Sequence, residues 1–187
     1  MNSTFLRSIA LIGAPFLLID FYVNGSAVGG ADYQHTSSSG FFGLIYMIGW
    51  SCSVMALINR NANNNKRIIR TLGFVQLGLL TLANLWNIYE IISPGANTLL
   101  FNILDLFWPL SNLFMLVLGI AVWRTSALEG WNKFAPLTAG LWLPVSAFLN
   151  LLIKDPELVM MISGMYSWLA WTWLAISTTS DKAHGMH

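Results

Sequence analysis

The chain has 187 residues, of which 56% are hydrophobic and 9% are charged, and its formal net charge is +1. Soluble domains carry roughly 25% charged residues, so this composition cannot build a surface that faces water. It excludes a soluble protein and predicts an integral membrane protein. The sequence also lacks the clustered basic residues of a nucleic-acid-binding surface, so no nucleic-acid partner is expected.

Six stretches of the sequence meet the requirement for a membrane span, which is about 20 mostly apolar residues. They cover residues 5–24, 41–58, 71–90, 100–123, 134–153 and 158–178. Turn-forming or charged residues separate them, as in S-P-G-A-N at 93–97. The connections are too short to fold separately. The sequence therefore predicts an all-α fold, in which residues 1–187 form one polytopic domain with a bundle of six transmembrane helices.

The positions of the basic residues predict the orientation of these helices. Eight of the nine fall in the N-terminal segment, the second and fourth connections or the C-terminal tail: Arg7, Arg60, Lys66, Arg67, Arg70, Arg124, Lys133 and Lys182. Only Lys154 falls in one of the remaining connections. Because lysine and arginine are enriched in cytoplasmic connections, we expect a multi-pass protein of the cell membrane with both termini in the cytoplasm.

Polar residues within the spans collect toward the extracytoplasmic ends. The candidates are Asp20, Asn84, Asn87, Glu90, Asn102, Asp105 and Asn112, together with Tyr46 and Trp50 on one face of the second span. Because lipid offers no hydrogen-bond partner, such groups face the bundle interior or a water-filled cavity. We therefore predict that these nine residues line an outward-facing acidic and amide pocket that binds a ligand or ion.

The fourth span carries the most detailed pattern. Asn102, Asp105, Pro109 and Asn112 are spaced so that they share one face of a continuous helix. Pro109 cannot donate a hydrogen bond to the backbone carbonyl of Asp105. We therefore expect this free carbonyl and the Asp105 carboxylate to form an electronegative notch. The structural alternative is that Asp105 and Glu90 are interfacial carboxylates and that the asparagines form interhelical hydrogen bonds.

Residue types that are absent from the predicted spans exclude several kinds of cofactor and catalytic site. No predicted span contains lysine or histidine, which excludes a retinal Schiff base and argues against bis-histidine haem and histidine-based zinc hydrolases. No glycine-rich phosphate loop precedes a helix. The sequence predicts no cofactor and no metal site, and it favours a protein that is not an enzyme.

Three functions remain open. The first is binding or transport of a cation, a proton or a small cationic solute. The second is a non-transporting binding or sensory module, or an accessory subunit, because the inner halves of the spans lack polar residues for a path. An enzyme acting on a lipid or an apolar metabolite has the least support, since no nucleophile accompanies the acids. The expected partners are bilayer lipid, a small ligand and further copies of the chain in a homo-oligomer.

Overall fold

All regular structure in the described part of the chain is helical. The computed structural model describes residues 3–25, 34–61 and 66–179. Six helical segments are long and apolar enough to cross a membrane: Ser3–Asn24, Ser37–Arg60, Arg67–Ile92, Leu99–Thr125, Gly130–Leu152 and Pro156–Thr179. Each overlaps one predicted span, so the all-α class and the number of apolar helical segments are confirmed.

Two of the six segments are interrupted, and a short 3-10 turn begins a third. The elements are α1 (Ser3–Gly13), α2 (Phe16–Asn24), α3 (Ser37–Arg60), α4 (Arg67–Ile92), α5 (Leu99–Asp105), α6 (Phe107–Thr125), η1 (Gly130–Phe134), α7 (Ala135–Leu152) and α8 (Pro156–Thr179). The first break lies between α1 and α2, where Pro15 cannot donate to the carbonyl of Leu11.

The second break lies between α5 and α6 at Leu106. Pro109 cannot donate to the Asp105 carbonyl, and the helix ends there and restarts at Phe107. Pro109 thus falls in the first turn of α6, where a missing N–H leaves no hydrogen bond unmade. Asn102 and Asp105 therefore lie on α5, whereas Pro109 and Asn112 lie on α6, so the four residues do not belong to the one uninterrupted helix that the sequence predicted.

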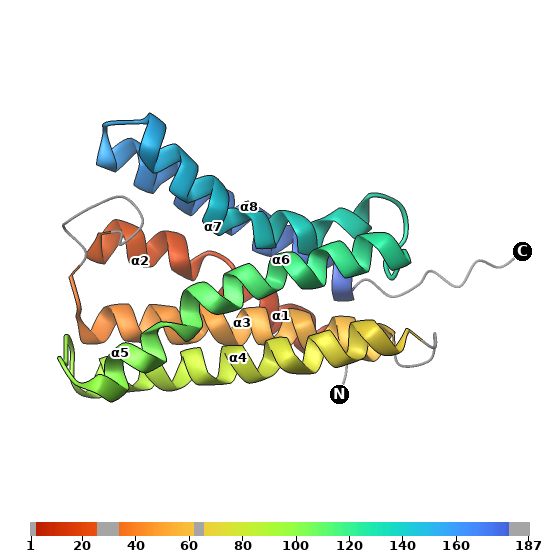
Figure 1. The fold of residues 1–187 in the computed structure, drawn as a ribbon, viewed down its shortest axis with the longest axis horizontal. Helices are drawn as coiled ribbons and strands as arrows, with labels where there is room; N and C mark the ends of the chain where they lie inside the picture. Colours follow the sequence, from red (N-terminus) through yellow and green to blue (C-terminus); the bar gives the residue numbers. More distant parts are fainter. Residues whose placement is uncertain (1–2, 26–33, 62–65, 180–187) are drawn as a thin grey trace, which may run out of the picture.

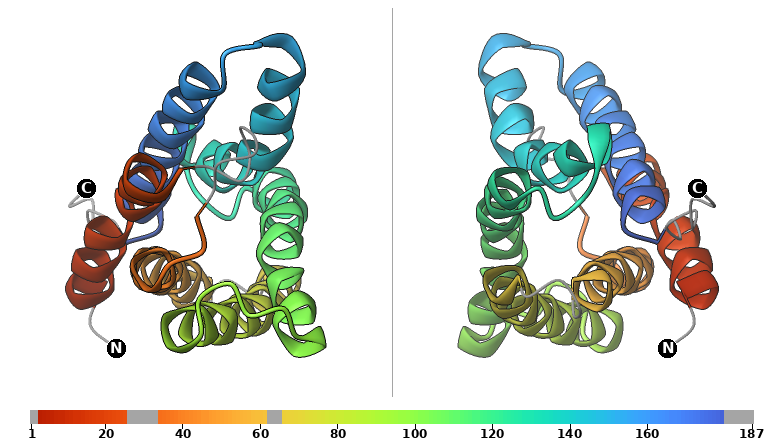
Figure 2. Two further views of the ribbon diagram at one scale, coloured as in Figure 1. Left: turned by 90° about the vertical axis from the view of Figure 1, so that its left-hand side faces the viewer. Right: turned by 90° about the vertical axis from the view of Figure 1, so that its right-hand side faces the viewer.

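The six segments form a closed ring in chain order. Each segment packs against the next, and α8 returns to contact α1, α2 and α3. Figure 2 looks along the bundle from its two ends and shows this ring, with α4 at the bottom and the α7–α8 hairpin at the top. Figure 1 shows the same hairpin leaning away from α3 and α4 at one end of the molecule.

Glycines set a close helix crossing between α1 and α3. A Cβ atom built on Gly13 of α1 would lie 2.7 Å from the Cα atom of Gly49 in α3. Side chains at either position would push the two backbones apart, so the crossing requires glycine on both helices.

The two ends of the bundle differ in charge. The described basic residues Arg7, Arg60, Lys66, Arg67, Arg70, Arg124 and Lys133 lie toward the end where α3 and α6 stop and α4 and α7 begin. We call this the basic end. The opposite end, where α2 and α4 stop and α3 and α5 begin, is called the pocket end, and Lys154 lies beyond the end of α7 on that side.

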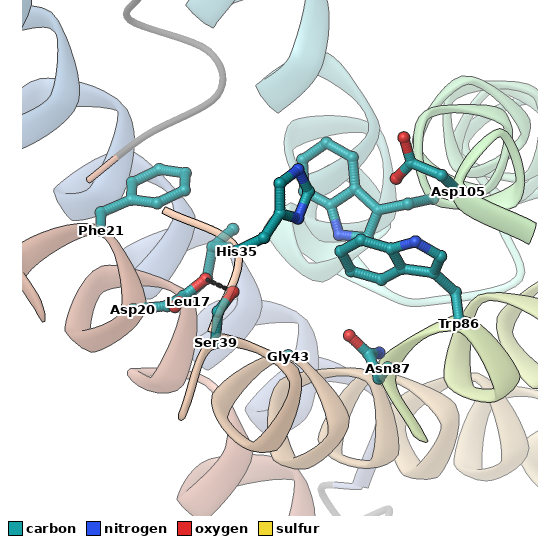
Figure 3. Close-up of a pocket in the computed structure, with 10 residues that line it drawn as sticks. Leu17, Asp20, Phe21, His35, Ser39, Gly43, Trp86, Asn87 and Asp105 are labelled. Carbon is teal, nitrogen blue, oxygen red and sulfur yellow. Dashed lines mark hydrogen bonds between the residues drawn. The ribbon is translucent and has the colours of Figure 1, made fainter. Parts of the chain in front are cut away.

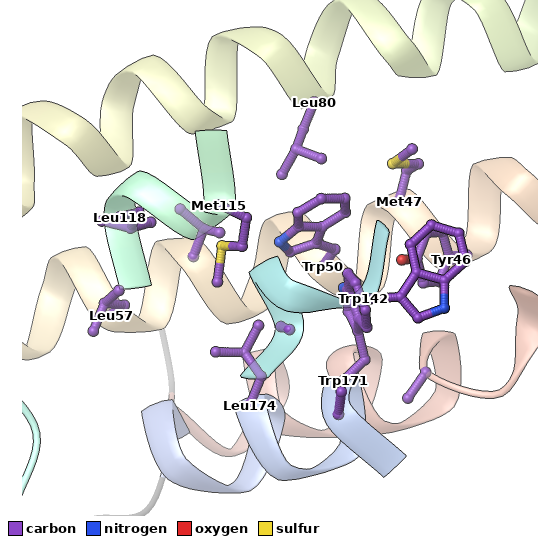
Figure 4. Packing of buried hydrophobic residues seen from close by; sticks show 14 of the residues in the cluster. Tyr46, Met47, Trp50, Leu57, Leu80, Met115, Leu118, Trp142, Trp171 and Leu174 are labelled. Carbon is purple, nitrogen blue, oxygen red and sulfur yellow. The ribbon is translucent and has the colours of Figure 1, made fainter. Parts of the chain in front are cut away.

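Aromatic and apolar side chains fill the middle of the ring. Figure 4 shows Trp50, Trp142 and Trp171 packed together with Tyr46. Each of these four side chains is at most 2% exposed. The ring centroids of Trp50 and Trp171 are 5.0 Å apart, and those of Tyr46 and Trp171 are 5.4 Å apart. Aromatic contacts of this kind add to the stabilisation from burial alone. We call these four residues the aromatic core.

Candidate functional site

A cavity of about 160 Å³ opens at the pocket end of the bundle. It is lined by Leu17, Asp20, Phe21, His35, Ser39, Gly43, Trp86, Asn87, Asp105 and Trp108. Five helices, α2 to α6, and the short segment that precedes α3 contribute these side chains. The cavity therefore exists only when these parts of the chain assemble. Its volume holds several water molecules and lies below the roughly 300–1,000 Å³ of pockets that take drug-sized ligands. It therefore suits a small solute.

Asp20 is a buried carboxylate in α2, held by hydrogen bonds on both oxygens. The amide Nδ2 of Asn24 donates to Oδ1 at 2.9 Å, and the hydroxyl of Ser39 donates to Oδ2 at 3.4 Å. Asn24 in turn accepts from the hydroxyl of Thr36 at 2.8 Å. Thr36 also caps α3, where its side chain accepts from the backbone N–H of Ser39. The end of α2 and the start of α3 thus fix one wall of the cavity.

Asp105 forms the opposite wall at the end of α5 and is exposed. Figure 3 shows His35 and Trp86 lying between Asp20 on one side and Asp105 on the other. Because Asp105 and the 42% exposed side chain of His35 both reach the surface, the cavity is accessible at this end.

Glu90 lies behind His35 and is fully buried. Its Oε1 atom is 3.0 Å from Nδ1 of His35, and its Oε2 atom accepts from the backbone N–H of Gly95 at 3.4 Å. These contacts join the segment before α3 to the end of α4. Since a buried carboxylate requires such partners, Glu90 holds His35 in the cavity wall.

An aromatic collar surrounds His35. Its ring lies edge-on to Trp86, with centroids 6.4 Å apart, and to Phe101, with centroids 5.8 Å apart. Trp86 and Phe101 also contact each other, at 5.5 Å between centroids. Trp86 and Trp108 both line the cavity. Tryptophan faces attract cations, so aromatic walls beside carboxylates favour a positively charged guest.

The aromatic core closes the cavity on the side that faces the basic end. Trp142 contacts two cavity-lining rings, Trp108 at 5.4 Å and Phe21 at 6.3 Å between centroids. The indole Nε1 of Trp142 donates to the carbonyl of Ser163 at 2.8 Å, which fixes this ring between α7 and α8. In this conformation the cavity therefore opens toward the pocket end and is blocked toward the basic end.

Three of the nine predicted site residues line the cavity, namely Asp20, Asn87 and Asp105. Glu90 lies next to it through His35. The structure thus brings together all three acids that the sequence singled out within the apolar segments.

The other five predicted site residues lie elsewhere and do not line this cavity: Tyr46, Trp50, Asn84, Asn102 and Asn112. Tyr46 and Trp50 belong to the aromatic core. Asn112 is fully buried in α6, where its Nδ2 atom donates to the carbonyl of Trp108 at 3.0 Å. Asn102 is exposed on α5.

His35 and Ser39 are polar lining residues that sequence reasoning missed. His35 lies between two predicted spans, and only polar groups inside the spans were considered. Ser39 was passed over for a similar reason, because the second predicted span begins two residues later. The signal that could have found them is the polar run H-T-S-S-S at 35–39, directly before an apolar helix.

A second hollow, of about 340 Å³, lies between α2 and α8. Its lining is apolar except for Glu157 and the hydroxyl of Tyr22, and Phe21 separates it from the first cavity. Because few polar groups converge there, it is a weaker candidate for specific binding.

The chemistry of the first cavity is that of an anionic, aromatic site. None of the described residues lining it is lysine or arginine, so no such side chain in the described lining neutralises its carboxylates. No group of three or more histidine, cysteine, aspartate or glutamate side chains within the described segments is placed to hold a metal ion. No family model, curated protein or solved structure matches the chain.

Proposed function

We propose that the chain is an integral membrane protein whose six apolar segments cross the bilayer, with the basic end in the cytoplasm. The length and composition of these segments support insertion. The excess of lysine and arginine at the basic end supports this orientation, which puts both termini in the cytoplasm of a cell-membrane protein. A cysteine introduced at Lys154, in a Cys52→Ser background, should react with an impermeant thiol reagent added outside cells. Reaction only after the membrane is opened would contradict this orientation.

We further propose that the cavity binds a cation or a small cationic solute from the extracytoplasmic side. The observation that carries this proposal is the gathering of Asp20 and Asp105 on opposite walls of one cavity, beside Trp86 and Trp108, with no lysine or arginine in its described lining. Two carboxylates in a partly buried site repel each other and attract a positive charge. Tryptophan faces add attraction for an organic ammonium group.

Calorimetric titration of the full chain in lipid nanodiscs tests this proposal. The probes are Na⁺, K⁺ and propylammonium, each added to wild-type protein and to Asp20→Asn and Asp105→Asn variants. We expect at least one probe to bind. Each substitution should weaken the affinity for that probe by about tenfold or more, since it removes a charge partner at nearly constant shape.

Asp155→Asn is the matched control. Asp155 is an exposed carboxylate at the same end, where it accepts from the backbone N–H groups of Glu157 and Leu158 at the start of α8. Asparagine keeps this capping role, so the variant should bind as the wild type does. Equal affinities for Asp105→Asn and wild type, or no binding of any probe, would overturn the proposed function.

Transport is a second candidate, favoured by the two interrupted segments. Both breaks lie in segments that line the cavity, since α2 carries Asp20 and the α5–α6 segment carries Asp105 and Trp108. Broken helices flank the substrate sites of many transporters. Transport would require the aromatic core to move aside. Flux of a bound probe into proteoliposomes would support transport, and binding without flux would leave a sensory or accessory binding module.

A further inference from the structure

Two residues that line the cavity each carry a buried hydrogen-bond donor without a partner among the described residues. The Nδ2 atom of Asn87 and the Nε1 atom of Trp86 have no hydrogen-bond partner among the described residues. Asn87 is 1% exposed and Trp86 is 6% exposed. A buried donor that makes no hydrogen bond is costly. A ligand oxygen in the cavity would remove that cost, which makes these donors a feature of recognition.

A glycine makes room for the Asn87 amide against α3. A Cβ atom on Gly43 would collide with Oδ1 of Asn87, so the amide oxygen packs directly against the bare backbone of α3. Its nitrogen lies farther from that position, at 3.6 Å. Figure 3 shows the Asn87 amide beside Gly43 at the lower wall of the cavity, with Trp86 above it. In this orientation Nδ2 is the end of the amide that has no partner among the described residues.

The walls of the cavity therefore differ in what they offer. Asp20 and Asp105 offer negative charge, whereas Asn87 and Trp86 offer N–H groups. We infer that the ligand is a small ammonium compound that also carries a hydrogen-bond acceptor, such as the hydroxyl of an amino alcohol or the carbonyl of an amino amide. This inference rests on the proposed binding of a cationic solute and adds a requirement for an oxygen close to the nitrogen.

Isosteric amine pairs test the requirement. Ethanolamine is compared with propylamine, and glycinamide with isobutylamine, by titration of the full chain in nanodiscs. The paired amines have equal charge and nearly equal size, so their affinity ratio isolates the oxygen. We expect at least one oxygen-bearing amine to bind about tenfold or more tightly than its partner, because only it satisfies the buried donors.

Two variants test whether the preference for oxygen-bearing amines depends on these donors. Asn87→Ala removes the amide, and Trp86→Phe keeps an aromatic ring but removes the indole N–H. Each should bring the affinity ratio of the paired amines toward one while the oxygen-free amine still binds. The control is Asn84→Ala, which removes the same side chain one turn earlier on α4, outside the cavity lining, and should keep the full ratio.

The outcomes separate this inference from the proposed function. If propylamine and ethanolamine bind equally well to the wild type, and glycinamide and isobutylamine do likewise, cation binding stands and the acceptor requirement is wrong. A preference that survives both Asn87→Ala and Trp86→Phe would also overturn the assignment. If none of the four amines binds, both the inference and the binding of organic ammonium compounds fail.

Discussion

The imidazole of His35 lies 3.0 Å from the carboxylate of Glu90, and this contact fastens the segment before α3 to the last turns of α4. Glu90 is fully buried, whereas the side chain of His35 is 42% exposed and faces the cavity. The pair therefore forms part of the cavity wall, in which the buried Glu90 positions a histidine that solutes can reach. The wall opposite Asp105 includes Asp20, and His35 lies between the two.

A double-mutant cycle with His35→Ala and Glu90→Gln should reveal the coupling of this pair. We expect an interaction free energy of about 1 kcal/mol, since one partner is buried and the other is half-exposed. Thermal and denaturant unfolding of the full chain in detergent, for wild type, both single variants and the double variant, supplies the measurement. Single-variant effects that simply add would show that the 3.0 Å contact contributes no net stability.

The crossing of α1 and α3 at Gly13 and Gly49 should tolerate no side chain. Gly49→Ala should destabilise the protein by about 1–3 kcal/mol, because the new Cβ would lie 2.8 Å from the Cα atom of Gly13. Gly78→Ala is the control within α4, since a Cβ there meets nothing within 4 Å. It should be neutral or stabilise by about 0.5–1 kcal/mol through helix propensity. If both variants unfold alike, the close crossing is not present.

Trp142 should be needed for the floor of the cavity. Trp142→Phe loses the hydrogen bond to the Ser163 carbonyl and part of the ring volume, so unfolding free energy should fall by about 1–3 kcal/mol. Trp131→Phe, at a side chain that is 81% exposed, should change it by less than about 0.5 kcal/mol. Unfolding monitored by circular dichroism measures both. Equal stability of the two variants would argue against a packed floor.

Much of the fold follows from the sequence for a simple physical reason. Long apolar runs separated by polar turns leave the backbone few options besides helices, so each of the six helical segments overlaps its predicted range. The interruption at Leu106 was not predicted, although Pro109 was noted. The position of a proline shows which backbone hydrogen bond is lost, but it does not show whether the helix only bends or is interrupted. That choice depends on packing against other helices.

The candidate site was predicted only in part. Charged groups in apolar segments are costly, so Asp20, Glu90 and Asp105 were identifiable, and the structure places all three at or beside one cavity. Amides were harder to assign, because Asn87 lines the cavity while Asn112 bonds within α6. Helical spacing identifies neighbours on one helix, but it does not reveal which neighbouring helix covers them. His35 required knowledge of how a connection folds back.

We propose that one cavity, open toward the extracytoplasmic side and closed toward the cytoplasm by the aromatic core, joins Asp20 and Asp105. Thiol labelling of single cysteines in the Cys52→Ser background, at position 105 (Asp105→Cys) and at position 115 (Met115→Cys), tests it most directly in sealed vesicles of known orientation. Met115 is fully buried within α6 beneath the cavity. We predict that an impermeant reagent modifies position 105 from the extracytoplasmic side alone and position 115 from neither side. Modification of position 115 from either side, or of position 105 from the cytoplasmic side, would show that the cavity is not closed by the aromatic core or does not open to the outside.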